Sequence, residues 1–181
     1  GKRGWMDMDE PGGALERQLA LLDSDTCNEL FLKGIREHCC EKAAKAAPFT
    51  DRELIDRTLA REVRQNREVG PLLHWMDRDA RTRLFLGLYE EKGFPAVEKY
   101  LPFLETELLN RLAKLEFERN RLLHFDTLAP LLDQKLLQRL LGRVAERKGL
   151  IAIARYAPLL DPAFWETLRL AKERRTGNKS C

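Results

Sequence analysis

The chain contains 181 residues, of which 44% are apolar and 34% are charged. The charged fraction exceeds the roughly 25% that is usual for soluble domains. Its 32 basic and 29 acidic residues nearly cancel, and the net charge of +3 does not indicate the strongly basic domain typical of nucleic-acid binding. The sequence has no run of about 18 apolar residues, so we expect no membrane-spanning helix.

The two ends of the sequence differ in composition from the part between them. Residues 1–13 are rich in glycine and acidic residues, and residues 173–181 are mostly polar and basic. Such composition interrupts regular structure and offers no apolar face to bury. We therefore predict a flexible leader over 1–13, a single helical-repeat domain over 14–172 and a basic tail over 173–181.

A short pattern recurs six times along the chain: an apolar pair followed by a residue that caps helices. The residue just before each pair, which we call the anchor, is proline in four of the six copies. The anchors are Leu21, Pro48, His74, Pro102, Pro130 and Pro158. Their spacing of 26 to 28 residues is typical of stacked helical repeats, in which no single repeat can bury its own apolar face.

Each anchor marks a break between two helices. Three positions after the anchor, the copies carry Ser24, Asp51, Asp77, Glu105, Asp133 and Asp161. Serine and aspartate are preferred N-cap residues because their side chains accept hydrogen bonds from the free N–H groups of the first turn. An anchor proline ends the preceding helix, since it lacks an N–H and restricts the residue before it. We predict that a long helix starts after each of these caps.

Apolar residues recur inside each predicted long helix at the spacing of one buried face. Six positions after the anchor stand Cys27, Leu54, Ala80, Leu108, Leu136 and Phe164, and ten positions after it stand Phe31, Thr58, Leu84, Leu112, Leu140 and Leu168. This spacing predicts an amphipathic helix of about fourteen residues, followed by a shorter helix of about seven or eight. Gly93 and Gly149 indicate helix ends. No segment alternates as a strand does, so the predicted fold is all-α.

These paired helices resemble the HEAT-like class of α-solenoids, although their period is shorter than the roughly 40–47 residues typical of that class. The Pro-Leu-Leu-Asp and Lys-Gly-Leu pieces, best preserved between Pro102 and Leu168, also resemble short helical repeats of bacterial proteins. The resemblance implies a fold and assigns no functional residue. We expect a right-handed α-solenoid of about six helix-turn-helix repeats of 26–28 residues.

An arginine column is the first candidate for a binding surface. Nine positions after the anchor, four consecutive copies carry Arg57, Arg83, Arg111 and Arg139. Equivalent positions in a solenoid lie about 8–10 Å apart, which is one helix-packing distance. Four guanidinium groups at that spacing are candidate ligands for the phosphates or acidic side chains of a partner.

The same arginines also fit ordinary surface decoration. Three of them follow an acidic residue by four positions, and these acids are Glu53, Asp79 and Glu107. Each pair would contribute only about 0.2–0.5 kcal/mol to its helix. The acids would also neutralise the column, and only Arg139 has a lysine, Lys135, in place of such a partner.

Cysteine and histidine residues do not form a metal-binding motif. Cys27, His38, Cys39 and Cys40 show none of the short spacings with which zinc ligands are usually presented. Cys27 falls in the predicted core column, where a thiol behaves as a small apolar group. The four cysteines, which include Cys181, are too few and too irregular for a secreted disulfide scaffold. We expect no metal and a reducing compartment, the cytoplasm.

No catalytic motif is present either. His38, His74 and His124 lie in three different repeats, and no serine or cysteine stands in a nucleophile elbow. Glu62 and Glu116 could be proposed as paired carboxylates, but we interpret both as solvated residues at the flank of their helices. No glycine-rich phosphate loop occurs. We therefore expect neither an enzyme nor a cofactor.

The leading functional hypothesis is a non-enzymatic scaffold that binds a protein or peptide partner, because solenoids expose an extended surface. One alternative is nucleic-acid binding along the arginine column, with support from Lys114, Arg119, Arg143 and Arg147. Another is a structural spacer within a larger protein. The identity of the partner and the oligomeric state stay open at this point.

Overall fold

The structure is a computed structural model that describes residues 17–177. About 80% of the chain is helical and the described part contains no strand, which confirms the all-α prediction. Within residues 17–177, no helix combines the length and the apolar character needed to cross a bilayer. The predicted leader and the last four residues of the predicted tail lie outside the described residues.

The chain divides into two compact units, residues 1–88 and 89–181, and the division falls inside helix α5 (Arg78–Lys92). In the first unit, long helices alternate with short helical segments. These elements are α2 (Ser24–Arg36), α3 (Cys40–Ala46), the 3₁₀ segment η1 (Ala47–Phe49), α4 (Arg52–Arg64) and the 3₁₀ segment η2 (Gly70–Trp75). The short segments α3 and η1 pack back on α2, and η2 packs on α4.

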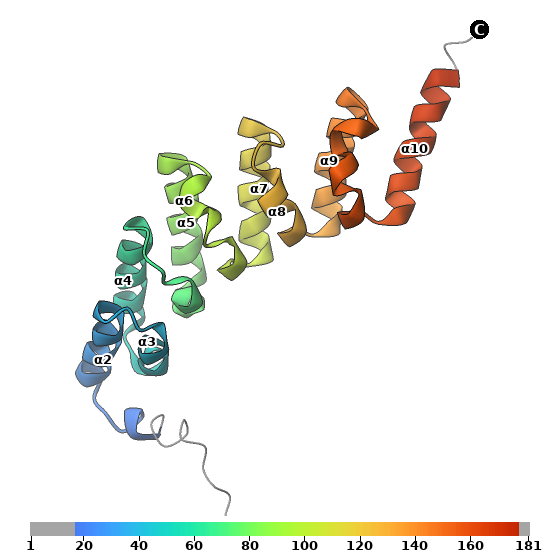
Figure 1. Cartoon of the computed structure of the whole chain (residues 1–181). Helices are drawn as coiled ribbons and strands as arrows, with labels where there is room; N and C mark the ends of the chain where they lie inside the picture. The colour runs from blue at the N-terminus through green and yellow to red at the C-terminus, as the bar shows by residue number, and fades with distance from the viewer. Residues whose placement is uncertain (1–16, 178–181) are drawn as a thin grey trace, which may run out of the picture. The chain divides into compact units, whose positions relative to one another are not determined.

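The second unit repeats this alternation (Figure 1). Its elements after α5 are α6 (Pro95–Glu98), η3 (Leu101–Phe103), α7 (Thr106–Asn120), α8 (Phe125–Leu128), η4 (Ala129–Leu131), α9 (Gln134–Lys148), η5 (Leu150–Leu159) and α10 (Pro162–Gly177). Helix α8 packs on α7, and η5 packs on both α9 and α10. Helix α10 continues to Gly177, so it includes the first five residues of the predicted tail.

The first long helix has its N-cap one position before the residue that the sequence pattern marked. The prediction of Ser24 as its N-cap is wrong, because Asp23 precedes α2 and its Oδ1 accepts the Thr26 N–H at 2.7 Å. A carboxylate at this place also gains from the positive end of the helix dipole, which a hydroxyl does not. The Ser24 hydroxyl instead donates to Asp51 Oδ1 at 2.9 Å.

The other predicted caps all precede a long helix, but they do not all act in the same way. Asp77, Asp133 and Asp161 each accept a backbone N–H from the first turn, at 3.0, 2.8 and 2.8 Å. Asp51 and Glu105 form no such bond with their own helix. With Asp23 as the first cap, the six caps are 26 to 28 residues apart.

The core includes the positions four and eight residues after the caps of α2, α4, α5, α7 and α9. The side chains at these positions that are less than 9% exposed are Cys27, Phe31, Ile55, Leu59, Arg81, Phe85, Leu109, Ala113, Leu137 and Leu141. Burying a large apolar side chain contributes about 1.5–3 kcal/mol. Arg81 is the polar member of this set, and its Nη1 donates to the Leu73 carbonyl at 2.6 Å.

A polar residue five positions after the cap joins one long helix to the cap of the next. Asn28 on α2 contacts Asp51 twice: its Oδ1 accepts the Asp51 N–H at 2.9 Å and its Nδ2 donates to Asp51 Oδ2 at 2.6 Å. Asp56 on α4 accepts the Asp77 N–H at 2.8 Å. We call this contact the cap clasp. It recurs in the second unit, where Asn110 Nδ2 donates to Asp133 Oδ2.

The clasp can be tested at Asn28. Asn28→Ala removes both contacts with Asp51, and we expect it to lower the free energy of unfolding by about 1–2 kcal/mol. The matched control is Glu29→Ala on the same helix, which removes only an exposed ion pair with Arg36 and should change stability by less than about 0.5 kcal/mol. Urea denaturation of both variants gives the comparison, and equal losses would contradict a specific role for the clasp.

Candidate functional site

The four arginines of the predicted column are all exposed. Arg57 and Arg83 belong to the first unit, and Arg111 and Arg139 belong to the second. Across the described residues none of the four arginines forms a salt bridge. The ion pairs expected with acids four positions earlier are therefore not formed. The structure thus shows four solvated guanidinium groups on long helices, without further organisation around them.

The cysteine and histidine group lies in the first unit. Cys27 is 1% exposed and its thiol donates to the Leu19 carbonyl at 3.5 Å. Cys40 donates to the Glu68 carbonyl at 3.2 Å. Burial raises the pKa of both thiols, and the neighbouring charge of Asp23 adds to the effect at Cys27. Among the described residues, no three His, Cys, Asp or Glu side chains converge as metal ligands.

Glu116 on α7 is a buried carboxylate, and its interpretation as a solvated flank residue is wrong. Its side chain is 0% exposed. Tyr89 donates its hydroxyl to Oε2 at 2.8 Å, Asn120 donates Nδ2 to Oε1 at 2.9 Å, and His124 Nδ1 lies 2.6 Å from Oε1. Glu62, the second residue interpreted in that way, is also buried, at 8% exposure.

The hydrogen bonds around Glu116 decide its protonation. Burial on its own would raise the pKa of this carboxyl group, but hydrogen bonds from His124, Tyr89 and Asn120 outweigh burial and hold the pKa below its usual value. The His124 ring stacks on Phe94 with centroids 4.9 Å apart and 8° between planes. Burial, together with the Glu116 charge, raises the pKa of the Tyr89 hydroxyl.

This network fixes the segment that follows α7. Asn120 and His124, at its two ends, both contact Oε1 of the same carboxylate. Residues 121–123 lie between them, and Arg121 has φ +59° and ψ −115°. Two tethers on one buried group hold this short segment in a conformation that an arginine rarely adopts.

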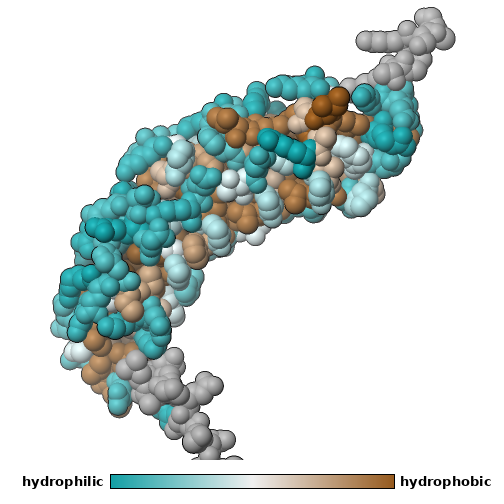
Figure 2. Space-filling model, viewed as in Figure 1, coloured by the Kyte–Doolittle hydropathy of each residue, from teal (hydrophilic) through white to brown (hydrophobic). Residues whose placement is uncertain are grey.

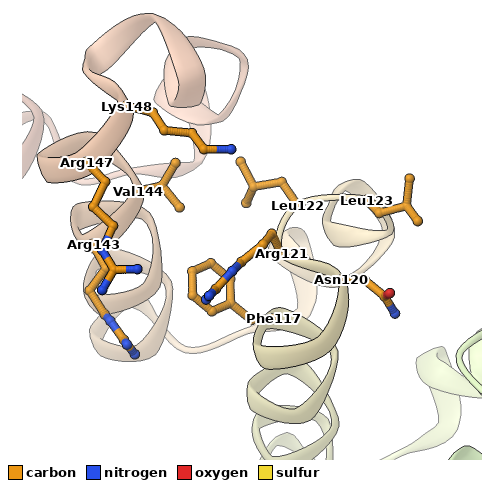
Figure 3. Close-up of a pocket in the computed structure, with 9 residues that line it drawn as sticks. All are labelled: Phe117, Asn120, Arg121, Leu122, Leu123, Arg143, Val144, Arg147 and Lys148. Atoms are coloured by element: carbon orange, nitrogen blue, oxygen red, sulfur yellow. The ribbon is translucent and has the colours of Figure 1, made fainter.

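A pocket of about 350 Å³ lies between the C-terminal ends of α7 and α9 in the second unit (Figure 3). We call it the α7–α9 pocket. Its lining residues are Phe117, Asn120, Arg121, Leu122, Leu123, Arg143, Val144, Arg147 and Lys148. Figure 3 shows Phe117 and Arg121 on one side, facing Arg143 and Val144 on the other. The pocket therefore combines an apolar interior with a cationic rim.

The positive charge of the α7–α9 pocket is not balanced within the described structure. None of the nine described lining residues is acidic, and over residues 17–177 Arg143, Arg147 and Lys148 make no ion pair. Other exposed arginines do find partners, such as Arg119 with Glu90 at 2.6 Å and Arg155 with Asp126 at 3.1 Å. The negative end of the helix dipole favours cations in the last turn of a helix. This explains Arg147 and Lys148 on α9, but Arg143 lies before the last turn.

Arg121 carries a conformational cost that its visible contacts do not offset. It stands sixteen residues after its cap, the place that Gly93 and Gly149 occupy after theirs, and all three have positive φ. An arginine in this region costs about 1–3 kcal/mol. Its guanidinium lies 5.7 Å from the centroid of the Phe117 ring, a contact worth about 0.5–1 kcal/mol at an exposed site.

No protein-family model, no curated protein and no solved structure matches this chain. The functional interpretation therefore rests on the residues themselves.

The sequence signal that could have revealed the burial of Glu116 is its distance from the cap of its helix. Leu88 and Val144 stand at the same distance from their caps and are buried apolar residues, which marks position 116 as a core position.

The strain at Arg121 can be measured. Arg121→Gly removes the clash of a β-carbon at positive φ, and we expect it to raise the free energy of unfolding by about 1 kcal/mol. Arg121→Ala removes the same guanidinium but keeps a β-carbon, so it should not stabilise the fold. Chemical denaturation of the two variants separates strain from charge. Equal stabilities of the glycine and alanine variants would show that the backbone at this position is unstrained.

The role of Glu116 predicts a dependence on pH. Glu116→Gln should destabilise the fold by about 1–3 kcal/mol at neutral pH, because three partners lose an ionised acceptor. The pKa of Glu116 in the folded state lies below the unfolded value of about 4.3. Ionised Glu116 therefore stabilises the fold fully above the unfolded pKa, and this stabilisation is lost as the pH falls below that value and through the folded pKa. The difference between variant and parent should therefore narrow below about pH 4.

The control for this measurement is Glu118→Gln, an exposed position on the same helix. It should leave the unfolding free energy within about 0.5 kcal/mol of the parent at either pH. Urea denaturation of all three proteins at neutral and acidic pH gives the comparison. A difference between Glu116→Gln and the parent that stays constant across the pH range would contradict an ionised Glu116.

Proposed function

We propose that this chain is a non-enzymatic helical-repeat scaffold that binds a segment of a protein partner, and that the α7–α9 pocket is where the partner binds. The proposal includes the finer architecture expected from the sequence: a right-handed α-solenoid of about six repeats of 26–28 residues. Two observations support this architecture. The spacing of the caps is regular, and the cap clasp occurs at Asn28 and Asp56 in the first unit and at Asn110 in the second.

Helix α10 differs from the earlier long helices at one position of the core column. Eight residues after its cap stands Arg169, at the position where the earlier long helices bury Phe31, Leu59, Phe85, Ala113 or Leu141. Arg169 instead forms ion pairs with Glu166 at 2.5 Å and Glu173 at 2.6 Å on its own helix. A charged residue in this column gives α10 a polar surface where the earlier long helices are apolar, as on a capping repeat of a solenoid.

The observation that carries the binding proposal is the α7–α9 pocket, with its apolar interior and unpaired cations. Protein interfaces are enriched in arginine and aromatic residues, and their strongest contacts lie in apolar pockets surrounded by polar groups. Phe117, Leu122 and Val144 line the apolar interior, and Arg143 and Arg147 supply the charge. A protein segment offers both kinds of complementary side chain at close spacing.

The Glu116–His124 pair supports a structural rather than a catalytic role. A histidine paired with a carboxylate is one part of a nucleophile-activating arrangement. Among the described residues, however, His124 contacts Glu116 and Phe94, and no serine, threonine or cysteine hydrogen-bonds to its ring.

Three described cysteines, Cys27, Cys39 and Cys40, are free thiols, which supports the proposed cytoplasmic location.

Nucleic-acid binding is the second candidate, and the unpaired Arg143 and Arg147 are the observation that favours it. Two other features weigh against it. Arg119, one of the supporting residues, is tied to Glu90 and lies 5.0 Å from the Tyr89 ring centroid. The balanced overall charge of +3 also gives little long-range attraction for a polyanion.

A displayed random peptide library, selected on the full chain, tests the proposal. The pocket variant carries Arg143→Glu and Arg147→Glu, and the matched control carries the same charge change in the arginine column, Arg111→Glu and Arg139→Glu. We expect selected peptides to bind the parent and the control alike and to lose at least about tenfold in affinity for the pocket variant. All four positions are exposed, so both proteins should fold.

Three results would contradict the proposal. The first is that no peptide is selected. The second is that binding depends on the arginine column rather than on the pocket. The third is tight binding of duplex DNA with a slope of log K against log salt of about −3 to −4, which indicates four phosphate contacts. That slope, lost in either double variant, would establish the nucleic-acid alternative.

A further inference from the structure

The residues that line the α7–α9 pocket indicate which side chains of a partner it binds. We propose that it recognises an acidic side chain that directly neighbours a large apolar side chain in a protein segment. This inference rests on the proposed function, because it specifies what the pocket binds. The apolar side chain enters between α7 and α9, and the carboxylate stays at the rim among the guanidinium groups.

The apolar part of the ligand follows from the interior of the pocket. Phe117 and Val144, which are 2% and 8% exposed, line the hollow between the two helices together with the half-buried Leu122. The volume of about 350 Å³ is at the low end of the roughly 300–1,000 Å³ found for ligand pockets. It has room for one or two side chains and is too small for a whole helix.

The anionic part follows from the geometry of the rim. Arg143 and Arg147 are four residues apart on α9, so their guanidinium groups share one face of the helix. Like charges at this spacing repel each other, and an anion between them removes the repulsion. A carboxylate matches the planar guanidinium fork and accepts two hydrogen bonds from it.

Arg121 supplies a third guanidinium from the opposite wall, as Figure 3 shows. Its backbone conformation is held by the Glu116 tethers at residues 120 and 124. The contact between the Arg121 guanidinium and the Phe117 ring does not offset the strain in the Arg121 backbone. A favourable contact with a bound anion accounts for an arginine at a place where Gly93 and Gly149 stand after other caps.

Exposed apolar residues that follow the C-terminal ends of α7 and α9 extend the surface for a protein segment. Leu123 is 70% exposed and Ile151 is 87% exposed, and both stand eighteen residues after their caps. Figure 2 shows apolar surface among hydrophilic surface near the C-terminal ends of α7 and α9. Two apolar contacts at one repeat spacing suit a protein segment that passes across successive helices.

The same features disfavour the other anionic partners. Base stacking in single-stranded nucleic acid needs an open aromatic face, whereas Phe117 is almost completely buried. A lipid surface is flat and cannot reach an apolar interior that lies inside a pocket. The acidic residue of a protein segment can bring its apolar neighbour into the hollow, because adjacent side chains are only a few ångströms apart.

The composition of the selected peptides tests this inference on the full chain. Peptides whose binding is lost in the Arg143→Glu, Arg147→Glu variant should be enriched in an aspartate or glutamate next to a phenylalanine, tyrosine, leucine or isoleucine. The most enriched peptide is then the probe for calorimetry. Changing its acid to the matching amide, or its apolar neighbour to alanine, should each weaken binding by about tenfold.

Arg121→Gly is a second variant, in which weaker binding cannot be the result of unfolding. It should weaken binding of the same probe about tenfold while the protein remains at least as stable as the parent. Pocket-dependent peptides without the acidic and apolar pair would overturn this inference and leave the proposed function standing. The absence of any pocket-dependent peptide would overturn both. Competition with the probe by lipid vesicles or by single-stranded DNA at low concentration would also overturn this inference.

Discussion

The structure depends on how the N-terminus of each long helix is satisfied. The first turn of a helix has free N–H groups, and leaving them unpaired costs stability. In this chain two of the residues that precede a long helix, Asp51 and Asp133, also accept hydrogen bonds from side chains of the preceding long helix. Asp133 shows this most clearly, since it accepts the Leu136 N–H of its own helix and the Asn110 side chain of the preceding one. These hydrogen bonds lower the pKa of Asp133, so one carboxylate both caps its helix and fixes the position of the preceding one.

A buried charge governs the second unit in a comparable way. Removing Glu116 from water is costly, and the cost is offset only because three neighbours hydrogen-bond to the carboxylate. Two of these neighbours bracket residues 121–123 and hold Arg121 at positive φ. One wall of the α7–α9 pocket, residues 120–123, is thus positioned by a buried polar network. A satisfied buried charge and a strained backbone at Arg121 are two results of one interaction.

Sequence reasoning worked best where a single helical turn contains the decisive residues. Helix starts at Asp77, Asp133 and Asp161 follow from a preferred cap beside an apolar pair. It failed at Ser24 because two capping residues are adjacent and the pattern alone does not rank them. It failed at Glu116 because a glutamate was interpreted by its charge, although its place in the core column indicated burial.

The sequence by itself determined that the chain is all-helical and where the long helices begin, because periodicity and capping act within a few residues. Only the tertiary structure decided the α7–α9 pocket. Phe117 and Arg121 lie more than twenty residues from Arg143 and Arg147 in the chain, and the direction in which each side chain points depends on helix packing. A local pattern records which residues are apolar or charged, but not which of them meet across two helices.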